Sequence, residues 1–305
     1  MDADLSHLLK GLTGKERQGI RRAYRYCLDH FSSMPCRSGG TCAEHCVRVA
    51  LILKEKVHNG PALRAALLHV LPDHPDGGSL PQDAPIGSER ELWMISRLSS
   101  ACSEEALSWP TPVSIDDPRL PMLFAAHALE QIRRMEKQDK ARRRACCRRT
   151  FAHIAPMMRQ LRLDDWAVEM EDRCFLEMKP FIAKRLGALA ESSRNKDIVL
   201  LKHAKRLLEN ELASVHEPCS VEYRIKSLYG TYRKMQEHRT TWEKCHDRLA
   251  LRIICTDDAA CYRILDRVQR LFLPVTRLLK DHIARPKENG YQAIHAIVVS
   301  PRSPD

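Results

Sequence analysis

The sequence predicts an α+β protein, with an all-helical region up to residue 215 and a mixed α/β domain from residue 216 to residue 305. Two observations predict this fold class. Apolar residues recur at three- and four-residue spacing through the first two thirds of the chain, which is the period of amphipathic helices. After His216-Glu217-Pro218 the pattern alternates between strand-like and helix-like runs, which is typical of an α/β domain.

The helical region divides at polar and proline-rich breaks. Helices are expected at Leu5–Leu28, Ala43–Val57 and Ala62–Leu71, and again from Met122 to about Leu212. Two segments are expected to be loops because each contains four prolines, namely Pro72–Ser88 and Trp109–Pro121. In the mixed domain, helices are expected at Leu228–Gln236 and Asp258–Leu271, and strands at Leu249–Cys255 and Tyr291–Val299.

Length and composition indicate a folded protein without membrane contact. A chain of 305 residues with 44% hydrophobic residues can form two compact domains. No apolar run approaches the roughly 20 residues that span a bilayer, and Met1–Gly11 lacks the features of a secretory signal, so a cytoplasmic location is expected. The 12 cysteines are therefore expected to be thiols. Chance clustering is favoured over a zinc site for one dense group, which is Cys36, Cys42, His45 and Cys46.

A net charge of +11 favours polyanionic partners such as nucleotides, RNA or ribosomes. The densest basic run is Arg142–Arg149. A solvated helix face is its commoner meaning, and nucleic-acid contact is the alternative. Nothing in the sequence predicts an oligomeric state.

One group of cations precedes and enters the strand Leu249–Cys255. Triphosphates need several cationic partners, and arginine offers a planar fork for stacking while lysine offers a point charge. A carboxylate just before this strand is well placed to hold Mg²⁺ at a strand edge. The candidate residues are Arg224, Lys226, Lys234, Asp247 and Arg252.

A second group follows Lys280. Pro286 and Gly290 are expected to set a turn that presents cationic, amide and aromatic side chains together, so that a tyrosine stacks on a base while a lysine meets phosphates. The candidate residues are Lys280, Lys287, Asn289, Tyr291 and His295. Taken singly, each residue is more simply interpreted as a surface or turn residue, and Asp247 alone could cap a neighbouring segment. The ordered set predicts a nucleotide phosphate site.

Three stretches within this set resemble the synthetase domain of the RelA/SpoT family, bacterial enzymes that make and degrade the alarmones ppGpp and pppGpp. They are Tyr223–Tyr229, Tyr232–Met235 and Ala284–Gln292. The resemblance implies a nucleotidyltransferase-like fold and, in the stringent response, pyrophosphoryl transfer from ATP to the 3′-hydroxyl of GDP or GTP. It implies Mg²⁺ as the cofactor, with ATP and GDP or GTP as the partners.

Carried over by position, Arg224 and Arg252 would sandwich adenine, and Lys226 and Lys234 would contact the ATP phosphates. Asp247 would be the catalytic metal ligand. The resemblance assigns the GDP or GTP side to one set of residues, in which Tyr291 stacks on guanine: Lys280, Lys287, Asn289, Tyr291 and His295.

Two departures from the family pattern occur in this domain. Leu278-Leu279-Lys280-Asp281 stands where many members have Arg-x-Lys-Asp, and His282 replaces a usual tyrosine. The family also places a catalytic glutamate on a strand beyond the position of Asp305, so the synthetase domain is expected to be incomplete in this sequence.

Before the synthetase, the family carries a helical HD-type hydrolase whose metal is bound by a histidine, a His-Asp pair and a distant aspartate. His45 and His69 match two of these ligands, whereas Val70 and His127 stand at the two aspartate positions. Loss of the carboxylates predicts a pseudo-hydrolase. Recruitment of a transition metal by the three histidines is the alternative. The expected domains are a degenerate HD-type domain at 1–150, a helical connector at 151–215 and the first part of a synthetase domain at 216–305.

The sequence therefore predicts a (p)ppGpp synthetase that has lost hydrolase activity. The main alternative is a catalytically inactive nucleotide-binding or regulatory protein of the same family, because the catalytic glutamate is not among these residues. A basic RNA- or ribosome-associated helical protein is a third interpretation, based on charge alone.

Overall fold

The computed structural model describes residues 3–36, 38–71, 83–102, 117, 119–214, 216–245, 248–288 and 290–299. The chain forms two compact units, Met1–Pro180 and Phe181–Asp305. The boundary between them falls inside the segment that was expected to connect the two domains, and the three-part division of the sequence stays a prediction.

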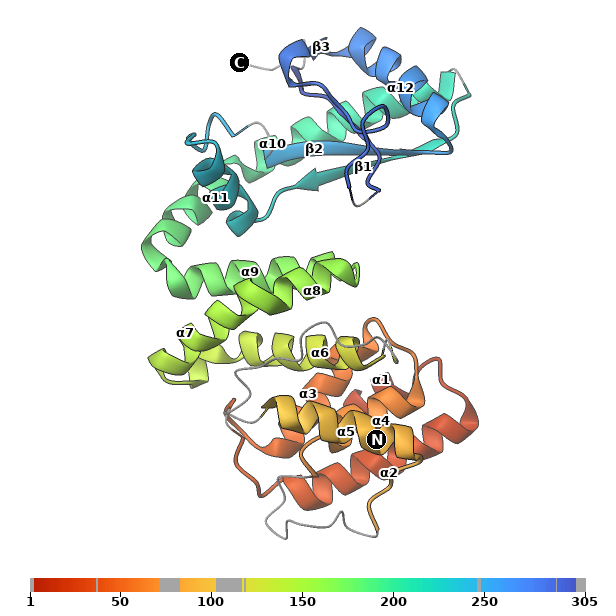
Figure 1. Ribbon diagram of the computed structural model, residues 1–305, viewed down its shortest axis with the longest axis vertical. Helices are drawn as coiled ribbons and strands as arrows, with labels where there is room; N and C mark the ends of the chain where they lie inside the picture. Colours follow the sequence, from red (N-terminus) through yellow and green to blue (C-terminus); the bar gives the residue numbers. More distant parts are fainter. Residues whose placement is uncertain are drawn as a thin grey trace. The chain divides into compact units, whose positions relative to one another are not determined.

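The described part of the first unit is built from helices (Figure 1). In chain order they are α1 (Ala3–Leu9), α2 (Gly14–Phe31), α3 (Cys42–Lys54), α4 (Gly60–Leu68), α5 (Glu89–Cys102), α6 (Arg119–Arg133), α7 (Lys140–Arg149), α8 (Ala155–Gln160) and α9 (Asp164–Met178). A short π-helical segment, Thr150–Ile154, joins α7 to α8.

The expected helix Leu5–Leu28 is wrong as a single element, because the chain turns between α1 and α2. Gly11 has a φ of 69°, in the left-handed region that side chains with a Cβ rarely adopt. Thr13 then starts α2 with a capping box, in which the Thr13 backbone N–H donates to the Glu16 carboxylate over 3.0 Å. Thr41 and Glu44 repeat this arrangement at the start of α3. Apolar spacing shows where helices lie, but these local caps decide where they begin.

The expected loop Trp109–Pro121 is also too long, because α6 begins at Arg119 and includes Pro121. Proline is tolerated in a first helical turn, where its missing N–H would have no partner in the helix. Most of the remaining loop, like most of Pro72–Ser88, lies outside the described residues.

The core of the first unit is formed by the inward faces of α3, α4 and α6. Leu53, Leu63 and Phe124 are almost completely removed from solvent, and many smaller aliphatic and alanine side chains pack with them. This close packing of central helices brings residues from three distant sequence segments together.

The basic run Arg142–Arg149 forms most of α7, and several of its side chains have partners inside the unit. The Arg143 guanidinium donates to Glu177 over 2.9 Å, and Arg149 donates to Gln131 over 3.1 Å. These contacts favour a paired helix face over a free nucleic-acid surface.

The second unit is mixed. After the 35-residue helix α10 (Pro180–Ser214) come β1 (Cys219–Ile225), α11 (Leu228–Glu237), β2 (Leu249–Cys255), α12 (Asp258–Leu271), β3 (Leu273–Pro274), β4 (Lys280–Asp281), β5 (Ile294–His295) and β6 (Val298–Val299). The expected strand Leu249–Cys255 and helix Asp258–Leu271 are confirmed with the same bounds.

The strands form antiparallel pairs. β1 pairs with β2 from Cys219 opposite Cys255 to Ile225 opposite Leu249, β3 pairs with β6, and β4 pairs with β5. The expected strand Tyr291–Val299 is wrong as a continuous element, because only β5 and β6 are paired within it. The helical first region and mixed second region confirm the α+β class. Within the described residues, no helix is long and apolar enough to cross a membrane.

We expect the core of the first unit to be sensitive to cavities. Leu63→Ala should lower the free energy of unfolding by about 2–5 kcal/mol, because Leu63 is fully buried and the space that it leaves cannot be filled by water. Urea denaturation measures this change. The matched control Leu176→Ala removes a side chain that is 45% exposed and should change stability by less than about 0.5 kcal/mol. Equal losses in the two variants would contradict the packing described here.

Candidate functional site

The β1–β2 ribbon places the two predicted adenine-binding arginines on one face. Arg224 lies opposite Ala250, and Arg252 lies opposite Glu222. Because side chains alternate along a strand, these residues share one face while Val221 lies on the other. Arg224 and Arg252 are thus diagonal neighbours, which lie about 7–8 Å apart in antiparallel pairs. Both are exposed, so the ribbon presents two guanidinium groups to solvent.

The predicted phosphate-binding lysines lie at the two ends of α11. Lys226 follows β1, where its backbone N–H donates to the Arg248 carbonyl over 2.9 Å. Lys234 lies in the last turn of α11, and its ammonium group donates to Glu237 over 2.8 Å. The proposed metal ligand Asp247 lies outside the described residues.

Arg248 is a residue whose role the sequence did not indicate. Its guanidinium is hydrogen-bonded to both carboxylate oxygens of Asp197 on α10, and it lies over the Trp242 ring at 4.9 Å from the centroid. This contact ties the start of β2 to the middle of α10. An Arg directly before an apolar strand was the only local signal, and a partner 51 positions away cannot be read from spacing.

The second group of predicted residues comes together in the segment from β4 to β5. Lys280 lies opposite His295 in the strand register. The Tyr291 hydroxyl is 2.9 Å from the His295 Nε2, and the Lys287 ammonium lies over the Tyr291 ring at 5.4 Å from its centroid. Four side chains predicted to bind the guanine nucleotide therefore form one exposed cluster, although Tyr291 itself is not in a strand.

A tight turn forms this cluster. The Gly290 N–H donates to the Lys287 carbonyl over 2.8 Å, and the Lys287 N–H donates to the Tyr291 carbonyl over 3.4 Å. Gly290 has a φ of 73°, which explains why glycine is needed there. Asn289 lies outside the described residues.

His282 and Asp281 complete the cluster and were not predicted as site residues. The His282 ring lies 5.3 Å from the His295 ring and 6.2 Å from the Tyr291 ring. Asp281 accepts hydrogen bonds from the backbone N–H groups of Ile283 and Ala284, both over 2.9 Å. The bond from Ala284 is the main reason that the pKa of Asp281 is below its ordinary value. Aspartate side chains commonly accept hydrogen bonds from backbone N–H groups about two residues further on, so the position of Asp281 in the sequence could have indicated this role.

Two hollows on the second unit lie away from these clusters. They have volumes of about 450 and 440 Å³, and both are lined by Leu212 and Glu217 near the end of α10. The candidate nucleotide residues do not line them. Arg224, Arg252 and the cluster around Tyr291 are exposed, whereas Lys226 and Lys234 are half-buried.

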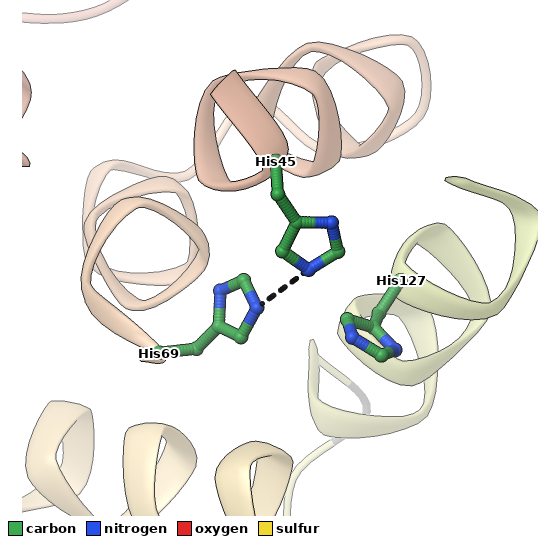
Figure 2. Close-up of side chains that lie close together, drawn as sticks. All are labelled: His45, His69 and His127. Carbon is green, nitrogen blue, oxygen red and sulfur yellow. Dashed lines mark hydrogen bonds between the residues drawn. The ribbon is translucent and has the colours of Figure 1, made fainter. Parts of the chain in front are cut away.

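In the first unit, the three histidines at the predicted hydrolase positions lie together (Figure 2). His45 comes from α3, His69 ends α4, and His127 comes from α6. One ring nitrogen of each lies within 4.8 Å of those of the other two, and the Nε2 atoms of His45 and His69 are 3.1 Å apart. The aliphatic Val70 follows His69 in the chain and is buried.

A buried polar network surrounds the histidines. The His45 Nδ1 is 2.8 Å from one oxygen of Glu130, and Arg48 donates to the other oxygen over 2.8 Å. Burial raises the pKa of Glu130, but the bonds to His45 and Arg48 outweigh it and hold this pKa below the ordinary value. Burial lowers the pKa of His69 to about 3, and it also lowers the pKa of His127. Near neutral pH, these two rings are therefore neutral and have a lone pair each.

The fold and the two clusters define a two-unit α+β protein, in which a helical unit with a buried histidine centre precedes a mixed unit with an exposed cationic and aromatic surface. Residues 223–304 match the family model described as "Region found in RelA / SpoT proteins". This match supports the resemblance to RelA/SpoT proteins that the sequence motifs predicted.

Relatives from plants and bacteria share similarity with both units. The chain is 26% identical over 278 residues to "Probable GTP diphosphokinase RSH3, chloroplastic" of Arabidopsis thaliana, covering 86% of this chain and 38% of that protein. It is 26% identical over 291 residues to "Bifunctional (p)ppGpp synthase/hydrolase SpoT" of Escherichia coli, covering 92% of this chain and 42% of that protein. The chain thus spans about two fifths of the length of these relatives. Its homologues are GTP diphosphokinases or (p)ppGpp hydrolases.

We expect Asp281→Ala to loosen the turn that shapes the second cluster. The amides of Ile283 and Ala284 would lose their acceptor, and the Tyr262 hydroxyl, which donates to Asp281 over 2.9 Å, would lose its partner. Amide hydrogen exchange at residues 283 and 284 should become faster. Asp258→Ala, at an exposed position of α12, should leave these amides unchanged. Unchanged exchange in Asp281→Ala would show that the carboxylate does not hold the turn.

Proposed function

We propose that the second unit binds ATP and GDP or GTP and serves (p)ppGpp synthesis. In this reaction the 3′-oxygen of the guanine nucleotide bonds to the β-phosphorus of ATP, the bond from that phosphorus to the α–β bridging oxygen breaks, and AMP leaves. The proton of the 3′-hydroxyl passes to a general base, for which the family resemblance provides a glutamate on a later strand.

The single observation that carries the proposal is the cluster of Lys280, Lys287, Tyr291 and His295. An exposed tyrosine such as Tyr291 can stack on a purine, and stacking of this kind contributes about 1–3 kcal/mol per base. The two lysines supply positive charge for the phosphates of the same nucleotide. These residues lie within the segment that matches the RelA/SpoT family model.

The donor nucleotide is assigned to the exposed face of the β1–β2 ribbon. Arg224 and Arg252 are spaced as diagonal neighbours, and a planar adenine can insert between two guanidinium planes at such a separation. Lys226 and Lys234 would then contact phosphate oxygens. For Lys234 this requires exchange of its present carboxylate partner, Glu237, for a phosphate.

Mg²⁺ is part of the proposal, with Asp247 as its protein ligand. A divalent ion bridging phosphate oxygens would neutralise the charge that develops during phosphoryl transfer. The lysines and arginines named above orient the two nucleotides and do not replace this function.

The first unit is proposed to be a pseudo-hydrolase. The HD-type site that the family resemblance implies requires two aspartates, and Val70 and His127 stand at these positions. Valine has no lone pair, and a neutral imidazole is a poor ligand for the oxygen-preferring ions Mg²⁺ and Mn²⁺. The unit therefore lacks the carboxylates that would hold such an ion and orient its water.

Synthesis is tested by incubating the 305-residue chain with ATP, GDP and Mg²⁺ and measuring ppGpp. We expect product above background, with loss of product on addition of EDTA. Tyr291→Ala should weaken GDP binding about 5- to 100-fold through loss of stacking, and Arg252→Ala should weaken ATP binding, both measured by calorimetry.

Two control variants accompany this test. Tyr291→Phe keeps the ring and loses only the hydroxyl contact with His295, so GDP binding should stay within a few-fold of the wild-type value. Arg270→Ala removes an exposed arginine of α12 and should leave both nucleotides bound normally. Nucleotide binding without product would favour the inactive, regulatory alternative. Absence of both binding and product would refute the proposal.

The chain should not release pyrophosphate from ppGpp in the presence of Mn²⁺. The bifunctional (p)ppGpp synthase/hydrolase SpoT of Escherichia coli serves as the positive control in the same assay. Release by this chain above background, abolished in His69→Gln, would show that the helical unit is an active hydrolase.

A further inference from the structure

The histidine centre of the first unit consists of His45, His69 and His127. The positions of its ring protons favour a bound cation. The His69 Nδ1 is 2.8 Å from the backbone carbonyl of Ala66. A carbonyl can only accept, so the Nδ1 of His69 carries the proton. The His45 Nδ1 faces the carboxylate of Glu130 over 2.8 Å, and an ionised carboxylate can also only accept.

Both rings therefore direct the lone pair of their Nε2 atoms inward. These two atoms are 3.1 Å apart and almost completely removed from solvent. Two lone pairs at this distance repel each other unless a positive charge lies between them. A proton shared by the rings is one solution, and a metal ion bound to both nitrogens is the other.

The third histidine decides between these solutions. A shared proton needs only two acceptors, but the His127 ring also lies within this centre, 5.0 Å from the His45 ring and 5.3 Å from the His69 ring. Figure 2 shows the three rings facing one another from separate helices. Three converging imidazoles are a ligand set typical of zinc and other transition metals.

We propose that His45, His69 and His127 bind one transition-metal ion, such as Zn²⁺, through a nitrogen of each ring. The inference concerns the helical unit and does not depend on the proposed synthesis. It differs from the HD-type site that the family resemblance implies in its donors, which are all nitrogen, and hence in the class of ion that it selects.

The distances fit this assignment with a small adjustment. Tetrahedral Zn–N bonds of roughly 2.0–2.1 Å place two ligand nitrogens about 3.3 Å apart. The His45–His69 pair already has this spacing, at 3.1 Å. The widest pair is at most 4.8 Å apart, so its nitrogens must approach by about 1.5 Å. Rotation of one ring about its side-chain torsions provides such a movement.

The surroundings also fit a metal centre. Histidine ligands usually donate their second N–H to a carboxylate or a backbone carbonyl, which fixes the ring and raises its basicity. Glu130 has this position for His45, and the Ala66 carbonyl has it for His69. Arg48 in turn holds Glu130 through its other oxygen. Glu130 is thus a positioning residue for the proposed ion.

Because the ligands come from α3, the end of α4, and α6, a bound ion would link the central helices of the unit. An ion that binds the folded chain more tightly than the unfolded chain raises the melting temperature. At a free concentration of 100 times the dissociation constant, we expect an increase of about 5–10 °C for a unit of this size.

The test uses the full chain, freed of metal by chelation and then titrated separately with Zn²⁺, Co²⁺ and Mn²⁺. We expect one equivalent of Zn²⁺ or Co²⁺ to bind, with the rise in melting temperature given above, and Mn²⁺ to bind at least 100-fold more weakly. Four-coordinate Co²⁺ should show strong visible absorption without the charge-transfer band of thiolate ligands. This spectrum separates the histidine centre from the chain's cysteines.

His45→Gln and His127→Gln should each abolish stoichiometric binding, and Glu130→Gln should weaken it about 10- to 100-fold. His58→Gln, at an exposed position of the same unit, is the matched control and should bind normally. Circular dichroism of the metal-free variants checks that they are folded. Absence of binding to the wild-type chain, or binding unchanged in the first two variants, would overturn the proposal in favour of a shared proton or a cysteine site.

A second measurement introduces oxygen donors and follows the change in metal preference, so it does not rely on loss of binding. In the double variant Val70→Asp and His127→Asp, the donor set changes to two histidines and two carboxylates, so the preference for Zn²⁺ over Mn²⁺ should fall by at least tenfold. An unchanged preference would show that position 127 does not contact the ion.

Discussion

The antiparallel pairing of β1 with β2 is the constraint on which the second unit depends. Its register places Val221 and Leu251 on the face that packs with α10 and α12, and it places Arg224 and Arg252 on the opposite face. A shift of one residue would exchange these faces, burying the arginines and exposing the apolar residues. The same pairing that forms the small core therefore also determines which cations are available to a ligand.

The first unit differs from the second in that several of its polar and charged side chains are buried in the core. A buried carboxylate is costly unless it is paired and hydrogen-bonded, and Glu130 satisfies this condition through His45 and Arg48. The imidazoles are accommodated as neutral rings, since burial lowers the pKa of both His69 and His127. Valine at position 70 and neutral histidine at position 127 thus add no negative charge to this core.

Much of the fold could be predicted from the sequence, for reasons that particular elements show. The bounds of β2 and α12 were correct because apolar alternation and an Asp N-cap mark them. The strand β1 was missed, although its apolar residues alternate with polar ones as in a strand with one buried face. The break in the first helix depends on the conformation of Gly11, which apolar spacing does not report.

The candidate sites were predicted as sets of residues but not as arrangements. Tyr291 and His295 were assigned to the same group of residues, but their contact was not predicted, because a continuous strand would hold positions four residues apart at about 13 Å. The role of Glu130 could not be predicted, because its contact with His45 spans 85 positions. Local sequence identifies chemical groups, whereas contacts between distant helices decide which groups meet.

The link between Asp197 and Arg248 has a mechanical consequence. A helix of 35 residues such as α10 is about 50 Å long, and Asp197 lies close to its midpoint. Because Arg248 directly precedes β2, the ion pair holds the start of the strand that carries Arg252 against the middle of this helix. The placement of that arginine thus depends on a carboxylate from a distant part of the sequence.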